Sequence, residues 1–312
     1  MLPAAFFAGF PIISFYKTFI LNRLELNRMI HADSLTSLIS FFNQKYAAIL
    51  PEPLNGITPA KLEAQLKGAY THFFVLLKRF SQGKSREFTQ IFVVYEMLQE
   101  TISNLRSAYR LQSVMSIPNR SPSDIIKIID QYNQEKDRHP VIYYESQLLQ
   151  SFAQTIITTL TQLDTDSATR EIISYWLDYH NLKIINELSY IYQIAVEPLQ
   201  VYLIRQGSND IILHIEGILR GDYLNHSSAH PLVAVFDPQS PAQNETRIQS
   251  ALFGVAKKQL SGFPFRYSYF IAFFILLHLE FHNLNILING KYHQLAPDEL
   301  QNMIIGYSFH GE

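Results

Sequence analysis

The sequence contains no cysteine, which excludes a disulfide scaffold, a thiolate metal site and a cysteine nucleophile. This absence is typical of a reducing compartment. Charge is also scarce, because charged residues make up only 17% of the 312 residues. The 25 basic and 27 acidic side chains give a net charge of −2, which offers no electrostatic footprint for a phosphate backbone. We therefore expect no nucleic-acid partner.

Long uninterrupted apolar runs are lacking as well. The longest are residues 267–279 and the first sixteen residues. Both stay below the roughly 18 apolar residues of a confident membrane-spanning helix, so we predict no direct membrane span. The N-terminal run also lacks a preceding basic residue and a small-residue cleavage site, which makes it a poor secretion signal.

Apolar and aromatic residues are abundant: 47% of the chain is hydrophobic, with 22 Phe and 18 Tyr. That content can bury a substantial core, and a surface poor in charge often meets a partner. Only 12 Gly and 14 Pro interrupt windows that place apolar residues at i, i+3, i+4 and i+7, which predicts an all-α protein. The clearest helix starts are Asp33-Ser34, Thr58-Pro59 and Ser123-Asp124, where a side-chain oxygen can bond the first free N–H groups.

Turn-forming residues interrupt the helical windows at four places, residues 51–59, 116–123, 205–210 and 237–245. The last of them is a long polar stretch, and we expect a mobile loop there.

All three Asn-Leu dipeptides of the chain lie late in long apolar segments that predict helices. The first copy has Thr101, Asn104, Leu105 and Arg106; the second has Asp178, Asn181, Leu182 and Lys183; the third has Glu280, Asn283, Leu284 and Asn285. On a helix, the Thr or acid and the Asn three residues later share a face, so each copy predicts a polar notch in an apolar helix. Asn-Leu pairs also arise by chance, so the motif alone leaves the relationship open.

The third copy belongs to a longer pattern. A Pro-led apolar helix carries an acid, then Asn-Leu, then Gly-Lys, a short loop and an acidic helix; the residues are Pro264, Glu280, Asn283, Leu284, Gly290, Lys291 and Asp298-Glu299. This order of features resembles the C-terminal signature of the C or d subunit family of V-type ATPases. Residues 21–50 look like the opening helices of that family, so the resemblance covers most of the chain.

The resemblance implies three related helical bundles in a pseudo-threefold arrangement, which we expect at residues 1–115, 116–205 and 206–312. It implies a non-catalytic protein without cofactor or metal, peripheral to the cytoplasmic face of a membrane. Members of the family cap the membrane rotor ring and couple it to the central shaft for ATP-driven ion transport. The implied partners are the rotor-ring and central-shaft subunits, and the repeat residues together with Lys291 would serve structure or contact.

The family tends to have a basic residue directly after Asn-Leu and again six residues beyond the Asn. The first copy keeps Arg106 and Arg110, whereas the second keeps Lys183 but has Glu187. The third has Asn285 and Asn289. A divergent member is implied, and an adaptor that shares the fold without joining an ATPase stays open as an alternative.

Two sets of histidines raise the further alternative of a metal-dependent hydrolase. His278 and His282 are four residues apart on a predicted helix, but HLEFH has Leu279 where H-E-x-x-H has its general base. Asp222, His226 and His230 also repeat every four residues, in a segment whose Ser and Pro residues disfavour a helix. We therefore interpret the first pair as packing or interface residues and the second set as a solvated loop. No phosphate-binding loop of the G-x-x-x-x-G-K-[ST] type occurs.

Overall fold

A computed structural model describes residues 10–50, 52–55, 58–80, 84–115, 123–136, 138–163, 165–193, 199–207, 211–212, 214–220, 230–262 and 266–306. Its regular elements in these ranges are all helices, and no β-strand occurs among them. The predicted all-α class is therefore confirmed.

The chain folds into two compact units. Unit 1 combines the two ends of the chain, Met1–Arg86 and Gln249–Glu312, whereas unit 2 is the continuous segment Glu87–Ile248. The chain passes between the units within two long helices, α6 (Lys84–Arg110) and α13 (Pro241–Leu260). The division into three bundles, and the pseudo-threefold relation between them, stay predictions.

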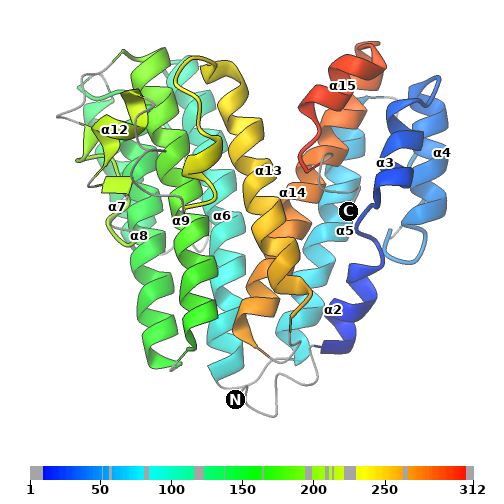
Figure 1. Ribbon diagram of the computed structural model, residues 1–312, viewed down its shortest axis with the longest axis horizontal. Coiled ribbons are helices and arrows are strands. Elements are labelled where there is room, and N and C mark those ends of the chain that lie inside the picture. The colour runs from blue at the N-terminus through cyan, green and yellow to red at the C-terminus, as the bar shows by residue number, and fades with distance from the viewer. Residues whose placement is uncertain are drawn as a thin grey trace. The chain divides into compact units, whose positions relative to one another are not determined.

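Unit 1 is organised around helix α14. Its helices are α2 (Phe10–Lys17), α3 (Arg23–Ile30), α4 (Leu35–Lys45), α5 (Pro59–Phe80), α14 (Tyr267–Tyr292), α15 (Pro297–Met303) and the C-terminal part of α13. Helix α14 packs against α2, α4, α5 and α15, and α5 and α14 lie side by side in Figure 1. Aromatic pairs join these two helices, because the ring centroids of Phe73 and Phe273 lie 5.3 Å apart and those of Phe74 and Phe274 lie 5.6 Å apart. Such edge-to-face pairs add to the burial of the rings themselves.

Helix α14 is apolar on all sides, as is typical of a helix surrounded by protein. It continues well past residue 279, where the sequence analysis ended the apolar run, and over its full length it is long and apolar enough to cross a membrane. Two thirds of its most apolar stretch are buried inside the protein, which is also what the core helix of a soluble protein shows. Its length and composition are therefore weak evidence for a membrane span.

Unit 2 consists of stacked long helices. Its elements are most of α6, α7 (Ser123–Glu135), α8 (Val141–Gln162), α9 (Ser167–Asn186), a π-helix at Glu187–Ile191, α12 (Ile215–Arg220), a 3-10 helix at Val233–Val235 and the start of α13. Helix α8 packs against α7 and α9, and α8 and α9 run beside each other in Figure 1. Trp176 of α9 lies in an aromatic cluster, 4.6 Å from the ring of Tyr95 and 5.5 Å from that of Phe152. One buried cluster thus holds α6, α8 and α9 together.

The three predicted helix starts are confirmed. Helix α4 begins after Ser34, whose hydroxyl accepts the N–H of Ser37 at 3.2 Å. Helix α5 begins at Pro59 and α7 at Ser123. Proline suits the first helical position because its missing N–H would have no partner there.

The prediction of a mobile loop at residues 237–245 is wrong, because α13 begins at Pro241 within that stretch. The polar residues that suggested a loop instead fix the helix start. Asn244 is buried and accepts the N–H of Asp237 at 2.8 Å, and Arg247 pairs with Asp237 at 3.0 Å. These polar side chains bond the turn before the helix.

Candidate functional site

The asparagines of the second and third Asn-Leu copies make the same contact. Asn181 accepts the N–H of Ile204 at 2.7 Å and donates to its carbonyl at 3.1 Å. Asn283 accepts the N–H of Ile305 at 2.8 Å and donates to its carbonyl at 3.1 Å. Both asparagines are fully buried, so each supplies hydrogen-bond partners for the backbone N–H and carbonyl of one buried residue outside the helices. Asn104 of the first copy is exposed and does not take this role.

The Thr or acid of each copy is buried as well. Thr101 donates back to the carbonyl of Met97 within its own helix, at 2.7 Å. Asp178 lies 3.0 Å from Nε2 of His230, and Glu280 accepts the N–H of Leu21 at 2.8 Å. The leucines Leu105, Leu182 and Leu284 are core residues. The two acids thus hold parts of the chain that are distant in sequence.

His230 corrects the expectation of a solvated histidine loop, because it is buried against Asp178. Its Nδ1 accepts the N–H of Val233 at 3.3 Å, so the proton of a neutral ring is on Nε2, which donates to Asp178. Asp222 and His226 lie outside the described residues. His278 is half-buried and stacks on Phe274, and His282 is exposed. Among the described residues, no group of three or more His, Asp or Glu is placed to hold a metal ion.

The basic residue of the first copy lies in a cluster of charges within unit 2. Arg106 donates through Nε and Nη2 to both oxygens of Glu145 at 2.6 Å, and its Nη2 lies 3.0 Å from both oxygens of Glu187. Such a two-point pair is the strong geometry for guanidinium and carboxylate. The hydrogen bonds with Glu145 raise the pKa of Arg106. Burial raises the pKa of Glu145, and the hydrogen bonds from Arg106 oppose that rise.

Glu187 begins the π-helix that follows α9. A π-helix inserts an extra residue into the helical turn, and such segments frequently mark functional sites. Here it brings the side chain of Glu187 to Arg106. The position six residues beyond Asn181, where the family tends to be basic, is thus filled by an acid that pairs with the basic residue of the first copy.

The later copies make related contacts through other donors. Lys183 of the second copy pairs with Glu245 at 2.7 Å. In the third copy Asn289 donates to Glu63 at 2.6 Å, while Oδ1 of Asn285 is buried without a hydrogen-bond partner in the described structure. Lys291 donates to the carbonyl of Ile30, and burial lowers the pKa of Lys291. We call the pairs Arg106–Glu145, Lys183–Glu245 and Asn289–Glu63 the three cross-helix contacts.

The acids of the cross-helix contacts occupy equivalent positions. Glu63, Glu145 and Glu245 are each the fifth residue of their helices, α5, α8 and α13. Each of these helices has a proline at or directly before its first residue. The sequence analysis missed this second repeat, although the shared spacing of Pro and Glu was a usable signal. Through the glutamate of this second repeat, each Asn-Leu helix contacts a helix from another part of the chain.

Large apolar residues are exposed at the ends of the two elements that carry Arg106 and Glu187. Tyr109 is the last residue but one of α6, and Leu111 and Val114 follow that helix. Ile191 is the last residue of the π-helix, and Tyr192 follows it. Burial raises the pKa of Tyr192, and Glu145, Glu187 and Tyr109 raise it further, which sets Tyr192 beside Tyr109 and the cluster. We call these five residues the apolar edge. Ile191 and Leu111 are 70% and 77% exposed, which is unusual for side chains of this size.

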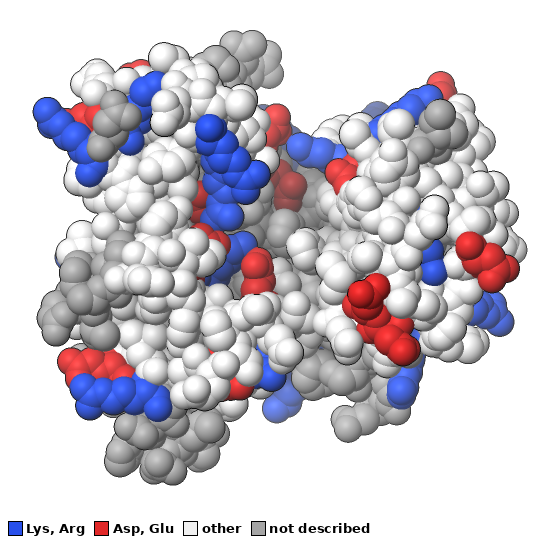
Figure 2. Space-filling model, turned by 90° about the horizontal axis from the view of Figure 1, so that it is seen from above, with Lys and Arg blue, Asp and Glu red and all other residues white. Residues whose placement is uncertain are grey.

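Charged side chains are sparse on the face of the molecule that Figure 2 shows. Figure 2 shows one face of the molecule on which most of the described surface belongs to neither Lys and Arg nor Asp and Glu. Surfaces of this kind favour contact with a protein partner over binding to a polyanion.

These features define an all-α protein whose long helices repeat an Asn-Leu segment and are joined by polar cross-helix contacts. The family of ATP synthase (C/AC39) subunits matches residues 11–303. The chain therefore belongs to this family of V-type ATPase subunits, which confirms the resemblance seen in the sequence. A search of curated proteins found no match.

Proposed function

We propose that the chain is the non-catalytic central-stalk subunit of a V-type ATPase, which caps the membrane rotor ring and couples it to the central shaft. Membership of the family over residues 11–303 is the observation that carries this proposal. In this role the chain lies on the cytoplasmic face of the membrane as a peripheral part of the complex. Its partners are the rotor-ring and shaft subunits. Its role is mechanical, and it catalyses no reaction itself.

A protein that couples two rotating parts has to transmit torque without deforming. Closely packed interiors have low compressibility, and buried polar networks fix one arrangement of the helices. The aromatic cluster around Trp176 and the Arg106–Glu145 contact supply such stiffness within unit 2. Both features support the proposal.

A protein in this position also needs surfaces for two partners. The apolar edge offers one, because exposed aliphatic and aromatic side chains are typical of the centre of a protein interface. We assign the apolar edge to one of the two partners.

The test is to purify the tagged chain from its native membranes in mild detergent and to identify bound proteins by mass spectrometry. We expect rotor-ring and shaft subunits together with the chain. Ile191→Asp should reduce their recovery at least about tenfold, because a charge replaces an apolar contact at the interface. Leu24→Asp, at a residue that is 60% exposed in unit 1, is the matched control and should keep the complex.

Two outcomes would count against this assignment. Loss of the complex with Leu24→Asp but not with Ile191→Asp would move the interface away from the apolar edge. A folded chain that is monomeric and carries no ATPase subunit would contradict the coupling role itself. It would favour an adaptor that keeps the fold and has another partner.

A further inference from the structure

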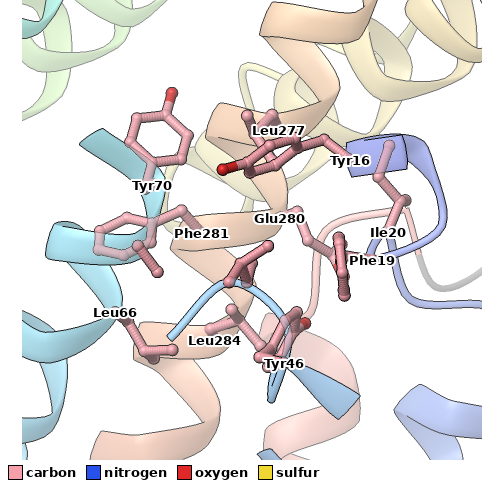
Figure 3. A pocket seen from close by; sticks show the side chains of 12 residues that line it. Tyr16, Phe19, Ile20, Tyr46, Leu66, Tyr70, Leu277, Glu280, Phe281 and Leu284 are labelled. Carbon is pink, nitrogen blue, oxygen red and sulfur yellow. The ribbon is translucent and has the colours of Figure 1, made fainter. Parts of the chain in front are cut away.

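A pocket in unit 1 combines apolar walls with a buried carboxyl group. It lies between α2, the end of α4, α5 and α14, and its volume is about 40 Å³. In Figure 3, Tyr16 and Phe19 lie on one side and Tyr70 and Phe281 on the other, with Glu280 between them. Together with Tyr46, five aromatic rings surround the carboxyl group.

Three polar atoms of the pocket side chains are buried without a hydrogen-bond partner in the described structure. They are Oε2 of Glu280 and the hydroxyl oxygens of Tyr16 and Tyr46. The other carboxyl oxygen, Oε1, accepts the N–H of Leu21 at 2.8 Å, which fixes the side chain in place. Glu280 itself is only 3% exposed. Buried polar atoms nearly always have a partner, so these three point to a group that occupies the pocket.

The surrounding residues offer little to balance a negative charge on Glu280. Lys45, the cation that lowers the pKa of Glu280, is hydrogen-bonded to Glu25 at 2.7 Å. The titratable side chains that line the pocket from α2, α5 and the end of α4 are the phenols Tyr16, Tyr70 and Tyr46. Burial raises the pKa of Glu280 to about 8, and the charge of Glu25 adds to this rise. The N–H of Leu21, the charge of Lys45 and the side chain of Asn283 oppose it. In the free protein a pKa near this value keeps the carboxyl group of the pocket mainly protonated at neutral pH.

We propose that this pocket binds a small primary alkylammonium ion, with its N–H groups bonded to Glu280 and Tyr46 and its carbon chain against the aromatic rings. A carboxylate attracts the cation, and aromatic faces attract it as well. The N–H groups supply the donors that the free oxygens lack, and the apolar walls fit the alkyl chain. A metal ion does not fit, because the pocket offers a single carboxylate amid apolar side chains.

The volume limits the ligand to a few non-hydrogen atoms, since one water needs roughly 10–15 Å³ measured in the same way. n-Propylammonium is a suitable probe and 1-propanol is its neutral counterpart. A ligand of this size is expected to bind with a Kd of roughly 0.1–10 mM. Because the bound cation favours the carboxylate, binding at pH 7 should release most of a proton from Glu280 to the buffer.

The experiment is calorimetric titration of the full chain with n-propylammonium at pH 7 in two buffers that differ in ionisation enthalpy. We expect saturable binding, proton release at pH 7 and almost none at pH 9.5. Glu280→Gln keeps the side-chain volume and an oxygen for the N–H of Leu21, and should weaken ammonium binding at least about tenfold. Tyr46→Phe should weaken it by a smaller factor. Glu216→Gln, at an exposed residue of α12, is the control and should leave binding unchanged.

Three results would overturn the proposal. No saturation up to about 50 mM would mean that only water fills the pocket. If Glu280→Gln and the unchanged chain bind n-propylammonium with equal affinity, the carboxyl group of Glu280 takes no part in binding. Binding of 1-propanol as tight as that of n-propylammonium would show that the pocket does not select a cation. None of these results bears on assembly with ATPase subunits, which the purification measures separately.

Discussion

Glu187 lies 3.0 Å from the guanidinium of Arg106, although the two residues belong to different copies of the Asn-Leu repeat. At the position of Glu187 the family tends to have a basic residue. A second cation there would stand beside Arg106 and raise the energy of the fold through like-charge repulsion. The acid instead completes a cluster in which one guanidinium is shared by two carboxylates. The departure from the family pattern is therefore matched by a contact within this chain.

Arg106→Ala should destabilise the protein. It removes the partner of Glu145, whose side chain is only 4% exposed, and leaves Glu187 beside it. Loss of one partner of a buried pair costs about 3–5 kcal/mol, and the 36% exposure of Arg106 reduces this to about 2 kcal/mol. Urea unfolding followed by circular dichroism measures the change. Arg138→Ala, which breaks the exposed pair with Glu135, is the control and should cost less than about 1 kcal/mol.

The asparagines of the three repeat copies should respond differently to truncation. Asn283→Ala and Asn181→Ala each leave a buried N–H and a buried carbonyl without partners, at a cost of about 2–4 kcal/mol. Asn104→Ala, at an exposed helical position, should change the free energy of unfolding by less than about 0.5 kcal/mol. Thermal and urea unfolding of the three variants gives the comparison. Equal losses at all three positions would contradict the distinct environment of the first copy.

Glu280 should make the protein less stable as pH rises from about 5 to 8. Its pKa is about 8 in the folded protein and near 4.5 in the unfolded chain. Between these values the folded state holds a proton that the unfolded state has lost, so the free energy of unfolding falls with increasing pH. The loss between pH 5 and 8 is roughly 3–4 kcal/mol. Glu280→Gln has no such proton and should flatten this part of the curve, measured by urea unfolding at several pH values. A slope unchanged by the substitution would assign the pH dependence to other groups.

Gly290→Ala should destabilise unit 1, although alanine normally stabilises a helix relative to glycine by about 1 kcal/mol. A Cβ at Gly290 would meet Cδ2 and Cγ of Leu300, which is fully buried in α15 and has little room to move. Overpacking of this kind costs about 1–3 kcal/mol. In the background of Leu300→Ala, the same change should be neutral or stabilising because the obstructing atoms are gone. A double-mutant cycle measured by thermal unfolding tests this coupling.

The sequence was sufficient for the fold class, because apolar spacing and capping residues are local properties. Ser34, Pro59 and Ser123 marked helix starts that the structure confirms. The Pro- and Asn-containing stretch 237–245 misled the same reasoning, since these residue types occur both in loops and at the starts of helices. The order of features along residues 264–304 was enough to identify the family, because that order combines several motifs in sequence.

The tertiary structure decided which members of the repeat are equivalent. Asn104, Asn181 and Asn283 look alike in sequence, yet only the last two are buried against a returning backbone segment. Whether an amide meets water or an unpaired N–H depends on residues that lie twenty or more positions away. Such a contact has no local spacing that a sequence pattern could reveal.

The dependence on distant neighbours also explains which properties of the charged residues follow from the sequence and which follow only from the tertiary structure. The sequence by itself determined that the chain is helical, poor in charge and related to V-type ATPase subunits, since these follow from composition and local order. Only the tertiary structure decided that Glu187 pairs with Arg106 and that Glu280 is enclosed by aromatic rings. The protonation state of a carboxyl group depends on its burial and on the charges around it. Only folding brings the residues that bury it and carry those charges to its side.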